Sequence, residues 1–115
     1  MNTQVFQRGD TVPIWAENRT NAGVLANPSA GIIVTLKKPD GTIAIEPDVA
    51  ETKIQDLAMT LPDVDGKYVY HFDSRAKGTP AVDEPTGWWH YFCTAIDGTD
   101  PDERVRISHG SFKLV

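Results

Sequence analysis

Two aromatic segments predict the fold of this chain: Gly66-Lys67-Tyr68-Val69-Tyr70-His71-Phe72 and Gly87-Trp88-Trp89-His90-Tyr91-Phe92-Cys93-Thr94-Ala95. Each segment starts at a glycine and then alternates residue by residue. Because successive side chains of a strand point to opposite faces, this alternation predicts one buried face in each strand. The residues predicted to be buried are Tyr68, Tyr70 and Phe72, together with Trp89, Tyr91, Cys93 and Ala95. We expect these two strands at the centre of a single core.

The length and composition are those of one soluble globular domain. The chain has 115 residues, of which 40% are hydrophobic and 23% are charged. Its formal net charge of −5 disfavours a nucleic-acid partner, because phosphate binding needs a basic surface. No apolar run approaches the roughly 20 residues that cross a bilayer, and the first eight residues do not resemble a secretion signal. We therefore expect neither nucleic acid nor a membrane as a partner.

The chain has a single cysteine, Cys93, so it cannot form an internal disulfide. The residue lies within an aromatic, alternating run. This position favours a small buried hydrophobic residue over a reactive thiol.

Glycine and proline recur at short intervals with no long helical period between them, which predicts short strands joined by turns. The expected strands cover residues 3–6, 11–17, 31–38, 42–46, 52–61, 67–72, 87–95 and 104–115. The segment 52–61 has a short helical turn as its alternative, and the last strand is expected to break near Gly110. Pro13 cannot donate to a strand ladder, so we expect it at an edge or a bulge. Pro39-Asp40-Gly41 predicts a tight turn between two strands.

Several short segments of the sequence resemble those of a known family. They are Phe6-Gln7-Arg8-Gly9-Asp10-Thr11-Val12, Val34-Thr35-Leu36-Lys37-Lys38-Pro39-Asp40-Gly41-Thr42, the two glycine-then-aromatic openings, and Gly110-Ser111-Phe112-Lys113-Leu114-Val115. Together they resemble the small immunoglobulin-like β-sandwich domains of macroglobulin-type, bacterial surface and phage structural proteins. The resemblance implies one all-β immunoglobulin-like sandwich of about seven strands over residues 1–115. Tyr91-Phe92-Cys93 is also similar to the Tyr-x-Cys of antibody-type domains, but the second cysteine of that disulfide is absent.

Three large aromatic residues form the candidate interaction surface: Trp15, Trp88 and Phe92. Their parity is opposite to that of the predicted core residues, so they are expected to face outward. Exposed aromatic residues on a sheet often mark a partner surface. The alternative is that a loop such as residues 74–86 covers them.

Other side chains favour structural interpretations. His71 and His90 would share an outer face if their strands paired, but with His109 they match no zinc spacing. The acidic residues Asp97, Asp100, Asp102 and Glu103 are typical of a polar turn, with a loose calcium loop as the alternative. Arg8-Gly9-Asp10 is interpreted as a turn rather than an integrin motif. No catalytic constellation is evident, so we expect no cofactor, no bound metal and no enzyme activity.

The sequence thus predicts a non-enzymatic structural or interaction module. The favoured hypothesis is a phage-like virion component, such as a decoration, neck or tail-associated protein, assembled in the host cytoplasm. Its partners would be other protein subunits, either virion proteins or further copies of itself. The alternative is a carbohydrate-binding or adhesion module of a bacterial surface protein, located outside the cell. Fold alone does not choose between them.

Overall fold

The computed structural model describes residues 4–20, 22–46, 52–60, 65–76, 81–98 and 103–115. Within these ranges the chain forms strands and no helix. The strands are β1 (Gln4–Phe6), β2 (Thr11–Glu17), β3 (Ile32–Lys37), β4 (Leu57–Ala58), β5 (Lys67–Asp73), β6 (Gly87–Asp97) and β7 (Glu103–Leu114). The prediction of an all-β chain is confirmed for this part of the molecule.

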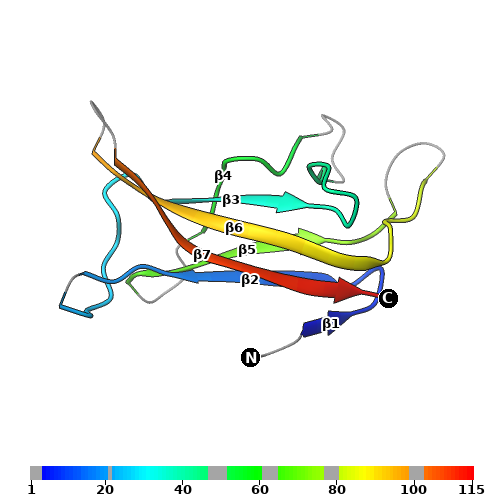
Figure 1. Ribbon diagram of the computed structural model, residues 1–115, viewed down its shortest axis with the longest axis horizontal. Helices are drawn as coiled ribbons and strands as arrows, with labels where there is room; N and C mark the ends of the chain where they lie inside the picture. The colour runs from blue at the N-terminus through cyan, green and yellow to red at the C-terminus, as the bar shows by residue number, and fades with distance from the viewer. Residues whose placement is uncertain (1–3, 21, 47–51, 61–64, 77–80, 99–102) are drawn as a thin grey trace.

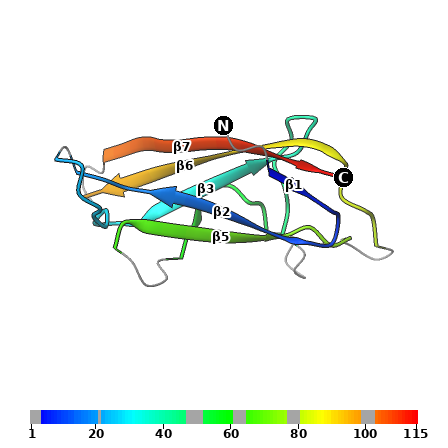
Figure 2. The same cartoon turned by 90° about the horizontal axis from the view of Figure 1, so that it is seen from below.

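The strands belong to two sheets (Figure 1). One sheet has the order β1-β7-β6-β3-β4, and the other contains β2 and β5. Strand β1 pairs with β7 in parallel, and every other strand pair is antiparallel. Figure 2 shows β6 and β7 in one layer and β2 and β5 in the other. Each sheet therefore has an inner face toward the other layer and an outer face.

The core fills the space between the two layers. Trp89, Cys93 and Ala95 are buried on β6, and Tyr68 and Phe72 are buried on β5. Tyr70 and Tyr91 are partly buried and pack against the same cluster. The parity predicted from the two aromatic segments is therefore confirmed for the core cluster. On β5, Val69 has the opposite parity and is buried as well, at its bridge with Thr60.

An aromatic cluster joins the layers at the centre of this core. The ring centroid of Phe72, from the two-stranded sheet, lies 5.2 Å from that of Trp89 in the five-stranded sheet. Trp89 also stacks on Phe112 of β7, with centroids 5.9 Å apart and an interplanar angle of 14°. The indole N–H of Trp89 donates a 3.0 Å hydrogen bond to the carbonyl oxygen of Pro85, so its one polar atom is satisfied in the interior.

Pro13 lies on an edge strand, as predicted. Asn18 N donates to Gly66 O at 2.8 Å, and Ser74 N donates to Asp10 O at 3.2 Å. These two bonds lie at the two ends of the β2–β5 pair. Because bonded residues alternate along an antiparallel strand, the even-numbered residues of β2 direct their N–H and C=O groups toward β5. The odd-numbered residues, Pro13 among them, turn their main chain toward the free edge. The missing N–H of this proline therefore removes no bond between β2 and β5.

Gly110 does not break the last strand, and the prediction of a break there is wrong. Strand β7 runs through Gly110. Its pairing with β6 shifts between Cys93 and Thr94, where Ile107 of β7 is the extra residue. Gly110 faces Tyr91 across the ladder, and a Cβ at residue 110 would lie only 2.7 Å from Tyr91 Cζ. Glycine at this position leaves room for the aromatic ring of Tyr91. Glycine within a strand commonly marks either a bend or such a close approach.

The middle of the chain is less regular than expected. Residues 42–46 and 52–61 contribute isolated bridges, Lys37 with Ile43 and Ile45 with Lys53, and only Leu57–Ala58 forms a named strand. Residue Asp56 has a φ of 54°, a left-handed conformation that interrupts extended backbone just before β4. Residues 47–51 and Leu61 lie outside the described residues.

The tight turn at Pro39-Asp40-Gly41 is confirmed. Lys38 N donates to Thr42 O at 2.8 Å across the turn. Asp40 Oδ1 accepts bonds from the hydroxyl and the main-chain N–H of Thr42, at 2.6 and 2.9 Å. These bonds, the hydroxyl's first, hold the pKa of the Asp40 carboxyl below its ordinary value.

Cys93 supplies a first testable prediction. Its side chain is fully buried, and desolvation raises the pKa of the thiol from 9.0 to about 12. We expect a chromogenic disulfide reagent at pH 8 to leave the folded chain unlabelled and to label it completely in guanidinium chloride. The thiol ionises more readily in the unfolded chain than in the folded one. The free energy of unfolding that comes from burying the neutral thiol is therefore complete below pH 9.0 and is lost as the pH rises toward 12. Rapid, complete labelling in native buffer would contradict the burial of this strand.

Candidate functional site

Strand β6 carries the candidate site on the side opposite to the core. Trp88 is 43% exposed and Phe92 is half-buried, whereas Trp89 between them is fully buried. Since β6 lies between β3 and β7, its outward residues have neighbours on both sides. Phe92 pairs with Thr35 on β3 and with His109 on β7.

The register defines a surface that we call the outer face. It consists of the outward-facing residues of β3, β6 and β7. They are Ile33, Thr35, Lys37, Trp88, His90, Phe92, Thr94, Ile96, Arg104, Arg106, His109, Ser111 and Lys113, of which Thr35 and Ile96 are buried.

Two cations converge on Phe92 at the centre of this surface. The guanidinium carbon of Arg106 lies 4.4 Å from the centroid of the Phe92 ring, and Lys37 Nζ lies 5.6 Å from it. Arg106 comes from β7 and Lys37 from β3, so the two approach from opposite sides of β6. Each such contact contributes about 0.5–1 kcal/mol at an exposed site.

Three of the cations on the outer face form no ion pair with a described residue. Among the described residues, Lys37, Arg106 and Lys113 have no carboxylate within ion-pair distance. Other cations of the described residues form ion pairs away from this face, among them Arg8 with Asp83, Arg19 and Lys67 with Glu17, and Arg75 with Asp73. The outer face is therefore a locally cationic surface on a chain with a formal net charge of −5.

The three aromatic residues predicted as an interaction surface do not lie together. Trp88 and Phe92 share the outer face, but Trp15 lies on β2 in the other sheet, directed away from the core on the opposite side. Trp15 is 51% exposed, so the predicted outward orientation of both tryptophans is confirmed. Their role in binding stays a prediction.

The described part of the loop 74–86 leaves these tryptophans accessible. Pro85 of this segment accepts the bond from Trp89, and Glu84 is buried. Gly87, at its end, lies against Pro39. Pro85 thus lies beside the core residue Trp89, and Trp88 next to it is still 43% exposed. Residues 77–80 lie outside the described residues.

The histidines are more separated than the sequence suggested. His71 and His90 would have shared a face only if β5 and β6 paired, but β5 pairs with β2 and β6 pairs with β3 and β7. The two imidazoles therefore belong to the outer faces of different sheets. The described residues contain no group of three or more His, Cys, Asp or Glu side chains that could hold a metal ion.

The predicted calcium turn falls mostly beyond the described ranges, which exclude Asp100 and Asp102. Its first residue, Asp97, has a structural contact. Asp97 Oδ1 accepts a 2.8 Å hydrogen bond from Ser29 N, which ties the end of β6 to the turn before β3.

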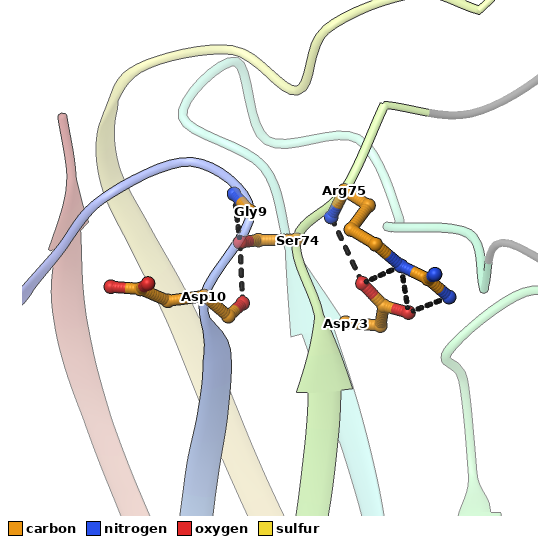
Figure 3. A network of polar contacts seen from close by, with 5 residues as sticks. All are labelled: Gly9, Asp10, Asp73, Ser74 and Arg75. Carbon is orange, nitrogen blue, oxygen red and sulfur yellow. Dashed lines mark hydrogen bonds and ion pairs between the residues drawn. The ribbon is translucent and has the colours of Figure 1, made fainter.

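Arg8-Gly9-Asp10 forms the predicted turn, and a buried serine holds it (Figure 3). Ser74 is fully buried, donates from Oγ to Asp10 O at 2.6 Å, and accepts from Gly9 N at 3.0 Å. The carboxylate of Asp10 accepts a 3.0 Å bond from Gln7 N. Gly9 has a φ of 99°, a conformation that favours glycine. This turn connects β1 to β2, and Ser74 attaches it to the end of β5.

Sequence reasoning missed the cations of the outer face. Lys37, Arg106 and Lys113 are scattered along the chain and form no motif. They come together only because β3 and β7 flank β6, and a local pattern contains no information on which strands pair. The sequence indicated only that Lys37 and Lys113 face away from the core in their own strands, because an apolar residue adjoins each of them.

Comparison with protein-family models, with curated proteins and with solved structures finds no match for this chain. Among its described residues, no helix has the length and apolar character needed to cross a membrane. The outer face therefore has to be interpreted from its own geometry and chemistry.

Proposed function

We propose that this chain is a non-enzymatic structural module of the immunoglobulin-like sandwich type, which binds another protein subunit through its outer face. One observation carries the proposal: Trp88 is 43% exposed directly beside the fully buried Trp89. An exposed tryptophan on the central strand of a sheet leaves a large apolar surface in water, and tryptophan is enriched among residues that dominate protein interfaces.

The arrangement of the aromatic residues favours a protein partner over a carbohydrate. A sugar-binding surface needs aromatic ring faces that are free to stack. The ring of Phe92 already has Arg106 and Lys37 over it. Trp15 and Trp88 lie on opposite sides of the molecule, so one oligosaccharide cannot contact both.

The proposed setting is a phage-like particle, in which the chain is a decoration, neck or tail-associated component. The support for this setting is the resemblance of the sequence to immunoglobulin-like domains of phage structural proteins. Virion components assemble in the host cytoplasm from protein subunits, and an exposed tryptophan on the outer face is suited to contact with a neighbouring subunit.

Association measurements test this proposal. We expect the chain, co-expressed with the products of its flanking genes, to self-associate or to co-elute with one of them in light-scattering chromatography. Trp88→Ala should weaken that association by about 2 kcal/mol or more, because it removes the largest exposed aromatic residue of the outer face. Its circular dichroism spectrum should stay that of the parent.

Trp15→Ala is the matched control, since it removes a tryptophan of similar exposure from the opposite sheet. It should associate as the parent does. A strict monomer that binds polysaccharide, or a Trp88→Ala variant that associates normally, would overturn the proposal.

A further inference from the structure

We propose, building on the function above, that the partner presents a carboxylate-rich protein segment to the outer face, and that Arg106, held against Phe92, is its main anchor. Three features of the outer face favour such a partner: the position of Arg106 over the Phe92 ring, the clustering of cations without an ion pair, and the occupied face of that ring.

Arg106 is organised in advance for a carboxylate. Its guanidinium carbon lies 4.4 Å from the Phe92 centroid, a contact that restricts the side chain. A guanidinium over an aromatic ring keeps its N–H donors, which lie in its own plane, and these match the two oxygens of a carboxylate. Restricting the side chain beforehand reduces the conformational entropy that binding must remove.

No described carboxylate lies within ion-pair distance of the two cations beside Phe92. Lys37 Nζ and the Arg106 guanidinium are both close to one ring, so they repel each other. Asp56, whose main-chain N–H donates to Thr35 Oγ1 at 3.1 Å, marks the margin of this surface but forms no ion pair with either cation. A bound carboxylate would relieve this repulsion.

Lys113 extends the cationic surface toward Trp88. The two residues are directly paired between β7 and β6. A carboxylate-bearing segment that also carries apolar side chains would place its charges near Lys37, Arg106 and Lys113 and its apolar groups near Trp88. The outer face therefore fits a mixed acidic and apolar protein segment.

Nucleic acid fits the same surface less well. Single-stranded nucleic acid needs aromatic faces on which bases stack, and the Phe92 ring already contacts two cations. The formal net charge of −5 also repels a polyphosphate at long range. A short acidic protein segment is less affected, because its few carboxylates can lie within the local cationic surface.

A peptide-display selection against the folded chain tests the inference. The target is the parent chain, and the selected peptides are then synthesised and measured by fluorescence anisotropy. We expect sequences enriched in Asp and Glu together with apolar residues. Their affinity should fall about tenfold or more in the Lys37→Gln/Arg106→Gln double variant, because charge-assisted hydrogen bonds are lost. Replacing the peptide's carboxylates with amides should have the same effect, and added salt should weaken binding.

The control is the Lys67→Gln/Arg75→Gln double variant, which removes the same charge from cations already paired with Glu17 and Asp73. It should bind these peptides as the parent does. Selected peptides without acidic enrichment, equal binding by both double variants, or tighter binding of a single-stranded oligothymidine would each overturn the inference. If one of these results is obtained and Trp88→Ala still abolishes association, the outer face remains the interaction surface. Only the proposal that the partner is acidic is then wrong.

Discussion

Trp89→Ala is expected to destabilise the chain by about 3–5 kcal/mol, a loss large enough to unfold a domain of ordinary stability. The indole is fully buried, stacks on Phe112, and lies 5.2 Å from Phe72 of the facing sheet. Its removal leaves a cavity at the contact between the layers and leaves the carbonyl of Pro85 without the indole donor. Equilibrium unfolding in urea, followed by far-UV circular dichroism, measures the loss.

Trp88→Ala provides the control for this measurement, because it makes the same substitution one residue earlier on the same strand. Trp88 faces outward and is 43% exposed, so its replacement should cost about 1 kcal/mol or less. Equal losses for the two variants, or a larger loss for Trp88→Ala, would show that the faces of β6 are assigned incorrectly.

Gly66→Ala is expected to cost about 3 kcal/mol or more, because two independent penalties coincide. Gly66 has a φ of 79°, which alanine adopts only at a cost. In addition, a Cβ at this position would lie 2.7 Å from both Ala26 N and Asn18 O, which are backbone atoms that cannot move independently of the fold. Thermal or urea unfolding of the variant gives the magnitude.

Gly23→Ala separates the two penalties. Gly23 has a φ of 82°, and a Cβ there would meet nothing within 4 Å, so only the conformational cost of about 1 kcal/mol applies. The difference between the two variants measures the close approach of residues 18 and 26 to the start of β5. If Gly66→Ala costs no more than Gly23→Ala, that approach is absent in solution.

Local patterns predicted the features of this fold that depend on neighbouring residues. Alternation alone identified the buried parity of β5 and β6, because a strand with one buried face repeats every second residue. The edge position of Pro13 and the turn at Asp40 followed from single-residue chemistry. The outward orientation of Trp15 and Trp88 followed from the same parity.

Features that depend on strand order could not be predicted in this way. The proximity of His71 to His90 assumed that β5 and β6 pair, and the two strands belong to different sheets. Gly110 looked like a break because a sequence does not show that Tyr91 lies opposite it. The convergence of Lys37 and Arg106 on Phe92 likewise depends on which strands flank β6.

Alternation along β6 directs Trp89 into the core and leaves Trp88 on an accessible outer face. The most direct test uses the three indole N–H signals of the chain in an NMR spectrum, assigned by single Trp→Phe variants, with a soluble gadolinium chelate added. We expect the signals of Trp15 and Trp88 to broaden strongly. The signal of Trp89, buried and hydrogen-bonded to Pro85, should stay sharp. A sharp Trp88 signal together with a broadened Trp89 signal would contradict this orientation of the two side chains.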